Sequence, residues 1–158
     1  MRPSLRTGLS FGLTSGVITT LGLMVGLHAG THSRNVVLGG ILTIAVADAL
    51  SDAMGIHLAE ESKNSGPPLY IWESTAATFG AKLFIALTFV VPVLLVSLQT
   101  AIILSVLWGF LLLALLSYFL ARTQQISPWK VIAEHLLIAL CVVTVAHYVG
   151  HWVQGLRE

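Results

Sequence analysis

Two aspartates stand four residues apart in a stretch that is otherwise apolar or small. They are Asp48 and Asp52. Residues four apart share one face of an α-helix, so both carboxylates point to the same side. Two carboxylates that close cannot both stay ionised in a low dielectric, and one should hold a proton when the site is empty. A divalent cation would favour two ionised carboxylates and would expel that proton.

The aspartate pair therefore indicates exchange of a metal ion for a proton. Two alternatives stay open at this point. The pair could be hydrogen-bonded to neighbouring helices as part of the packing, or it could relay protons without a metal.

Three glutamates form a second group of candidate ligands. Glu60 and Glu61 continue the segment that contains the aspartates, and Glu73 begins the next apolar segment. Carboxylates suit hard and borderline divalent metals. We expect these three to form an inner mouth for the ion, with solvated helix ends as the alternative. Lys82, inside the third apolar segment, either reaches the inner interface or pairs with a carboxylate.

Four histidines form two pairs with helical spacing. The pairs are His28 with His32 and His147 with His151. Two imidazoles four residues apart can bind one metal ion where the helix continues. We expect these four to lie near the outer surface, where they are either an exit or sensing site for metal or ordinary interfacial histidines.

The elements that position these residues follow from composition. The chain has 158 residues, of which 56% are hydrophobic and 9% are charged. A soluble domain carries roughly 25% charged residues, so lipid rather than water is the expected solvent for the apolar faces. The net charge of +1 gives no sign of a nucleic-acid partner. The single cysteine, Cys141, cannot form an internal disulfide.

Five segments have the length of about 20 residues that a membrane-spanning helix needs. They cover residues 9–29, 36–59, 74–98, 101–121 and 131–153. The sequence therefore predicts an all-α integral membrane protein with a single transmembrane domain over residues 1–158. The basic start of the first segment also fits a cleaved signal peptide, but the segment is long enough to be a spanning helix. We expect turns at residues 64–68 and 99–100, and a helix start at Ser127 and Pro128.

The basic residues predict the orientation. With five spans, one side holds Arg2, Arg6, Lys63, Arg122 and Lys130, and the other holds Arg34 and Arg157. The side richer in Lys and Arg is normally cytoplasmic. We expect the N-terminus in the cytoplasm and the C-terminus outside, in the inner membrane of a prokaryotic cell.

The first segment carries a face of small residues. Its members are Gly8, Gly12, Gly16, Gly22, Gly26 and Gly30, together with Ser15 and Thr19 on the same arc. Small residues at this spacing let helix backbones approach closely in a membrane. The face serves either packing within one subunit or a helix contact across a dimer.

Two motifs on these segments resemble those of the vacuolar iron transporter family. Residues 15–26, SGVITTLGLMVG, look like the family's first-helix motif D-G-(L/I/V)-(V/I)-T-T-F-x-(L/V)-(V/I)-x-G, and residues 47–55, ADALSDAMG, look like its second-helix motif A-D-x-x-S-M-A-x-G. Residues 76–92 and the Tyr148-Val149-Gly150 ending are similar to the family's third and fifth helices. The resemblance covers nearly the whole chain.

The resemblance implies a five-helix subunit that forms a homodimer through its first helix. The implied activity is proton-coupled export of ferrous iron or a similar divalent metal from the cytosol. The partners would be the metal ion, protons and the lipid bilayer, with no cofactor beyond the transported ion. Ser15, Thr19 and Met54 would line the pathway, and Asp48 and Asp52 would bind the metal.

The chain departs from the family's pattern at three places. Ser15 stands where the family has a metal-binding aspartate, and Asp52 stands where it has a methionine ligand. Loss of the soft sulfur favours manganese or magnesium, or a proton route, over iron. The metal-gathering insertion after the second helix is reduced to residues 61–72.

Two other classes of function are open on the residues alone. One is a non-transporting membrane module, such as an assembly partner or sensor. The other is an intramembrane enzyme, which we do not expect because the sequence has no H-E-x-x-H, no G-x-S-x-G and no serine with an evident base partner.

Overall fold

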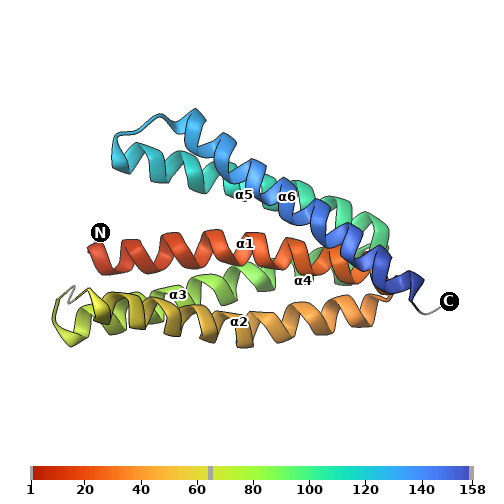
Figure 1. The fold of residues 1–158 in the computed structure, drawn as a ribbon, viewed down its shortest axis with the longest axis horizontal. Coiled ribbons are helices and arrows are strands. Elements are labelled where there is room, and N and C mark those ends of the chain that lie inside the picture. Colours follow the sequence, from red (N-terminus) through yellow and green to blue (C-terminus); the bar gives the residue numbers. More distant parts are fainter. Residues whose placement is uncertain (1, 64–65, 157–158) are drawn as a thin grey trace.

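A computed structural model describes residues 2–63 and 66–156 of the chain, and the regular structure in these two ranges is entirely helical (Figure 1). The elements are α1 (Pro3–Thr31), α2 (Arg34–Ser62), α3 (Pro68–Thr88), α4 (Val90–Leu95), α5 (Leu98–Gln124) and α6 (Pro128–Gly155). With α3 and α4 taken as one stretch, five helical stretches are long and apolar enough to cross a membrane. The predicted all-α fold with five transmembrane helices is confirmed.

The helices extend beyond the predicted segments at their ends. The first begins at Pro3 rather than near residue 9, and the second ends at Ser62 rather than near residue 59. Hydropathy marks only the part of a helix that lipid must solvate, whereas the backbone hydrogen bonds continue into polar residues. The predicted helix start at Ser127 and Pro128 is confirmed, with Ser127 at the N-cap and Pro128 as the first helical residue.

The third span is interrupted, which the sequence analysis did not predict. Regular α-helix stops after Thr88 and resumes at Val90. Pro92 has no N–H to donate to the Thr88 carbonyl, four residues earlier, and its ring crowds that carbonyl. The Phe89 N–H donates instead to the Ala86 carbonyl at 3.1 Å. The ring of Pro92 therefore interrupts the helix.

The predicted turn at residues 99–100 is wrong by three residues. The chain turns at Val96 and Ser97, and α5 already begins at Leu98. The Ser97 hydroxyl caps the new helix by accepting a hydrogen bond from the Thr100 N–H at 3.4 Å. Serine is a preferred N-cap because its oxygen satisfies a free N–H of the first turn.

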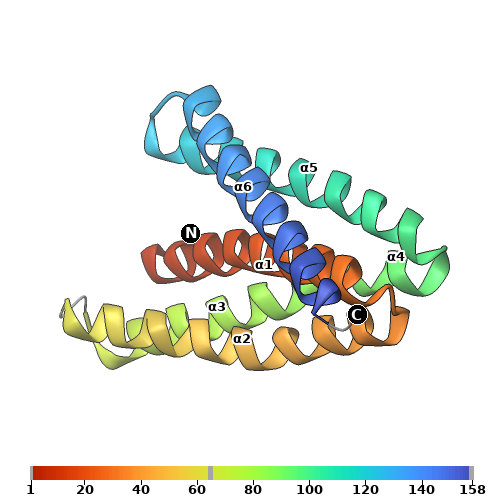
Figure 2. The ribbon, with the colours of Figure 1, turned by 45° about the vertical axis from the view of Figure 1, so that its right-hand side comes forward.

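Helix α1 is the central element, since it packs against α2, α3, α5 and α6. Figure 1 shows α1, α2 and α3 side by side, with the α5–α6 hairpin crossing over α1. The turned view in Figure 2 shows that the start of α1 and the end of α6 lie toward opposite ends of the bundle. Buried apolar residues of several helices form the core, among them Leu21, Met24, Ile41, Phe89 and Leu113.

The glycine face of α1 is used for packing inside the chain. Its first half lies on α3, where a Cβ added at Gly8 or Gly12 would stand 2.3 or 2.5 Å from a backbone carbonyl oxygen. Its second half lies on α6, where a Cβ at Gly26 would stand 3.2 Å from the Ala146 carbonyl oxygen. The intramolecular interpretation of this face is therefore confirmed, and the homodimer stays a prediction.

A polar contact joins α5 to α6. The Ser117 hydroxyl, on a residue that is fully buried, lies 2.7 Å from Nδ1 of His135. No base partner for this serine is evident in the sequence, because Ser117 and His135 are 18 residues apart and meet only through the packing of α5 against α6. The contact ties together two helices whose shared surface is otherwise mainly apolar.

A double-mutant cycle should give this contact a coupling free energy of about 0.6 kcal/mol, and no more than about 1.7 kcal/mol, which is the range for hydrogen bonds between membrane helices. The variants are Ser117→Ala, His135→Phe and their combination, measured by reversible unfolding in detergent micelles. Strictly additive effects would show that the hydroxyl and the imidazole do not interact.

Candidate functional site

The strongest polar cluster in the membrane-spanning part joins α1, α2 and α3. Lys82 Nζ lies 2.6 Å from Asp48 Oδ2, forms a second ion pair with Asp52, and lies 3.0 Å from Ser15 Oγ. The Ser15 hydroxyl donates to Asp52 Oδ2 at 2.6 Å. We call Ser15, Asp48, Asp52 and Lys82 the carboxylate–lysine cluster.

The cluster lies near the middle of the bundle. Asp48 has 14 residues of α2 on either side of it, and Lys82 is close to the centre of the stretch Pro68–Leu95. The Lys82 residue is 1% exposed, while the side chains of Asp48 and Asp52 are 32% and 21% exposed. Charged groups at this depth are costly and face one another or a cavity. The sequence predicts that Lys82 either reaches the inner interface or pairs with a carboxylate, and the structure shows the second.

The glycines of α1 bring α3 close enough for this pairing. A Cβ at Gly16 would stand 3.3 Å from the Cα of Lys82, which is tighter than most Cβ contacts, so glycine lets the two backbones lie this near without crowding. Ser15 is the adjacent residue on α1, and its hydroxyl reaches both Lys82 and Asp52. Close helix contact and the polar cluster thus depend on the same stretch of sequence.

Formal charges do not balance within the cluster. Two carboxylates face one ammonium, which leaves a surplus of one negative charge when both carboxylates are ionised. The ion pair with Asp52 is also a charge-assisted hydrogen bond, among the strong ones in proteins. A surplus negative charge is unfavourable where little water reaches it, so the cluster would be stabilised by one further cation.

One of the carboxylates borders a groove. Asp48 and Thr19 line a space of about 680 Å³ between α1, α2 and α6, whose wall also includes Cys141 and Val145. Most of the residues that line this groove are apolar, and the charged residue among them is Asp48. Thr19 donates its hydroxyl hydrogen to the Ser15 carbonyl at 2.9 Å and keeps the hydroxyl near the cluster.

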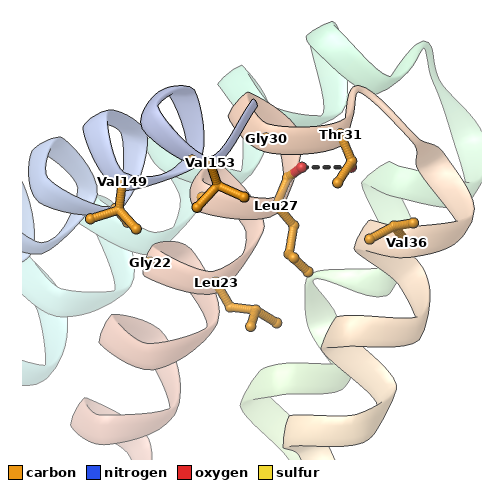
Figure 3. A pocket seen from close by; sticks show the side chains of 11 residues that line it. Gly22, Leu23, Leu27, Gly30, Thr31, Val36, Val149 and Val153 are labelled. Carbon is orange, nitrogen blue, oxygen red and sulfur yellow. Dashed lines mark hydrogen bonds between the residues drawn. The ribbon is translucent and has the colours of Figure 1, made fainter. Parts of the chain in front are cut away.

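A second groove of about 470 Å³ continues toward the C-terminal end of α1 (Figure 3). Gly22, Leu23, Ala146 and Val149 line both grooves. In Figure 3, Leu23 and Leu27 of α1 point toward the space that Val36 of α2 borders from the other side. The two grooves form one depression from Asp48 to the turn between α1 and α2.

The five carboxylates predicted to bind metal are not all gathered. Asp48 and Asp52 meet at Lys82, whereas Glu60 is buried and lies 3.4 Å from the ammonium of Lys63. Glu73 accepts a hydrogen bond from the Ser4 hydroxyl at 2.7 Å and pairs with Arg2 at the N-terminal end of α1. Glu61 is exposed. Across the two described ranges, no three His, Cys, Asp or Glu side chains are placed to hold a metal ion together.

Each predicted histidine pair does come together. The ring centroids of His28 and His32 are 5.2 Å apart, and those of His147 and His151 are 4.9 Å apart. The helix does not continue through the first pair, because His32 adopts a left-handed conformation with φ 52° after α1 ends at Thr31. Nδ1 of His28 is buried without a hydrogen-bond partner in the described part of the chain.

The predicted pathway residues divide into two groups. Ser15 belongs to the carboxylate–lysine cluster, and Thr19 borders the groove beside Asp48. Met54 lies on the exposed side of α2, with 49% of its surface accessible. The helical period places Asp48 and Asp52 together and Met54 on another face.

A further polar contact joins α2 to α3 through His57. Nδ1 of His57 lies 3.0 Å from the Thr75 hydroxyl, and its ring packs edge-on against Trp72 with centroids 4.6 Å apart. The place of His57 near Glu60 and Glu61, at the predicted inner end of α2, marks it as a candidate ligand in the sequence. Its partner Thr75 lies 18 residues away on α3, and no local pattern marks that contact.

Comparison with protein-family models yields no match to the chain, and comparison with curated protein sequences yields none either.

Proposed function

We propose that this membrane protein exchanges a divalent metal ion for protons, with Asp48 and Asp52 as the carboxylates that bind the ion. The observation that carries the proposal is the surplus negative charge of two carboxylates opposite one ammonium, at the middle of a membrane-spanning bundle. Ionisable residues inside a membrane are costly, and they commonly mark ion or proton pathways.

Charge balance supports exchange rather than simple binding. Without metal, one proton on the carboxylate pair and the Lys82 ammonium together offset two carboxylates. A divalent ion offsets both carboxylates by itself, so it expels the proton and repels the Lys82 ammonium from between them. Competition between the metal ion and the proton for the same carboxylates thereby couples the movement of metal to the movement of a proton.

The donor atoms that we propose for the ion are all oxygens. Asp48 and Asp52 supply carboxylates, and Ser15 and Thr19 supply hydroxyls next to them. Oxygen ligands suit magnesium and manganese, and the set lacks the soft sulfur that would favour iron. The proposed cargo is therefore a hard divalent ion of the manganese or magnesium type.

The proposal includes the setting that the sequence analysis predicts. The N-terminal end of the bundle would face the cytoplasm, since Arg2, Arg6, Lys63, Arg122 and Lys130 belong to that end. The membrane would be the inner membrane of a prokaryotic cell, and the resemblance to the vacuolar iron transporter family supports a homodimer.

A non-transporting membrane module is the second candidate. It draws support from the same ion pairs, since Lys82 already satisfies both carboxylates in part and so could serve only to hold α2 against α3. This candidate requires that the cluster bind no metal, and that uncharged residues at its positions preserve or raise stability.

Purified protein in liposomes, with Mn²⁺ outside, a metal-sensitive dye inside and an imposed pH gradient, tests the proposal. Wild type should carry Mn²⁺, and flux should collapse when the gradient is removed. Asp48→Asn and Asp52→Asn should each lower the flux about tenfold or more, because each removes a charged ligand from the ion.

Glu134→Gln is the matched control, since Glu134 is exposed and outside the cluster. Its flux should equal that of wild type. Equal flux in wild type and both aspartate variants, or no movement of any divalent ion in wild type, would disprove the proposal. Thermal unfolding with and without Mn²⁺ gives an independent reading, because a ligand of the folded state raises the apparent stability.

A further inference from the structure

We propose that Lys82 is a tethered cation that takes the place of the transported ion between Asp48 and Asp52, and so lets the unloaded protein complete its cycle. The inference rests on the proposed function and assigns a role to a residue outside the metal-binding pair. It makes Lys82 the determinant of net transport and of metal affinity.

The Lys82 ammonium lies against both carboxylates. Nζ of Lys82 contacts one carboxylate oxygen from each aspartate, Oδ2 in both cases. A metal ion bridging Asp48 and Asp52 would use oxygens of the same two carboxylates. Lys82 and a metal ion therefore compete for one position, and binding of the metal requires the ammonium to move away.

Lys82 is surrounded by few polar groups. It is almost completely buried, and the groups that face it are Asp48 and Asp52 from α2 and Ser15 from α1. Within the described residues, its ion pairs are with these two aspartates alone. His57, the nearest titratable residue along α2, is engaged with Thr75. Among the residues that the structure describes, Lys82 therefore pairs with no other charged group to which it could move when a metal ion displaces it.

The flexibility of the lysine side chain allows it to be displaced and to return. Lysine carries a compact charge on a flexible four-carbon stem with three rotatable donors. Such a group can leave the carboxylates and return without any movement of the backbone. An arginine guanidinium would instead bind carboxylates through a rigid fork, and would hold them more firmly.

The consequence concerns the unloaded half of the transport cycle. Net transport requires the empty site to change its accessibility, and two uncompensated carboxylates would make that step slow. Lys82 offsets one of the two charges while the site is empty, and the proton that returns in exchange for the metal offsets the other. Exchange of one metal ion for another across the membrane does not pass through the empty site, so it should not need Lys82.

Two measurements on the same liposomes distinguish net transport, which passes through the empty site, from exchange of metal for metal, which does not. One is net uptake of Mn²⁺ into metal-free vesicles, and the other is exchange of radioactive Mn²⁺ outside for unlabelled Mn²⁺ inside. In Lys82→Gln, net uptake should fall about tenfold or more, because an unpaired buried charge opposes the empty-site step. Exchange should stay near the wild-type rate, and Mn²⁺ should bind more tightly than to wild type because its competitor is gone.

Lys82→Arg is the second variant and keeps the charge opposite both carboxylates. It should fold, should keep a ratio of net uptake to exchange close to that of wild type, and should bind Mn²⁺ more weakly. Lys130→Gln serves as control, since Lys130 is exposed at the start of α6. Its uptake, exchange and affinity should match those of wild type.

Several outcomes would overturn the inference and leave the proposed function intact. One is unchanged net uptake in Lys82→Gln, and another is an equal loss of uptake and exchange with weaker Mn²⁺ binding, which indicates a merely structural lysine. If Lys82→Gln does not fold, a ratio in Lys82→Arg far below that of wild type would overturn it. Absence of both uptake and exchange in wild type would instead refute the proposed function, and the inference with it.

Discussion

Replacing Lys82 with methionine should lower the free energy of unfolding by about 3 kcal/mol, because it leaves two carboxylates without their counter-ion in the membrane-spanning part of the bundle. Loss of one partner of a buried ion pair typically costs about 3–5 kcal/mol, and the lower end applies here since both aspartates are partly exposed. The measurement is reversible unfolding in detergent micelles, without divalent metal.

A neutral version of the cluster provides the control for this prediction. Combining Lys82→Met with Asp48→Asn and Asp52→Asn removes every charge, and should return stability to within about 1 kcal/mol of wild type, as for other buried ion pairs replaced by uncharged residues. If the triple variant is as unstable as Lys82→Met alone, the loss comes from packing of the lysine stem rather than from its charge. Such a result would contradict the electrostatic account of the cluster.

Replacing Gly12 with leucine should prevent most of the protein from reaching its folded state. A Cβ at this position would stand 2.5 Å from the Thr78 carbonyl oxygen and 3.0 Å from the Ala81 Cβ, so α1 and α3 would have to separate. Overpacking commonly costs about 1–3 kcal/mol, and a clash with backbone on one side leaves little means of relief. Separation would also carry Ser15 away from Lys82, since both lie about one turn further along the same contact.

Gly80→Leu is the matched substitution. Gly80 lies on α3 in the same region, but a Cβ there would meet no atom within 4 Å. The yield of monodisperse protein and the thermal midpoint should be close to those of wild type, whereas both should fall sharply in Gly12→Leu. Equal behaviour of the two variants would show that α1 and α3 are not in the close contact described above.

Much of the architecture could be predicted without the structure. Lipid must solvate each spanning helix along its length, so hydropathy alone located all five spans. The helical period placed Asp48 and Asp52 on one face. Segment ends were less accurate, because polar residues such as those around Ser62 continue a helix without any hydrophobic signal.

Tertiary structure decided what the aspartates face. Lys82 could reach either the membrane interface or a carboxylate, and only the packing of α3 against α1 and α2 selects the carboxylates, across 30 residues of sequence. The same packing leaves Glu60 with Lys63 and Glu73 with Arg2, rather than beside the aspartates. Periodicity is a local property of one helix, whereas a site depends on which faces of separate helices meet.

The glycine face of α1 is the clearest example of a feature that the sequence predicts and whose partner only the packing decides. From the sequence alone it predicted a close helix contact on α1, and that contact exists. Its partner was not specified, because a small-residue stripe fits any backbone that approaches it. The structure places α3 on Gly8, Gly12 and Gly16 and α6 on Gly22, Gly26 and Gly30. Sequence thus determined the helices, their spans and the shared face of the two carboxylates, while packing between helices determined that one buried lysine lies between those carboxylates.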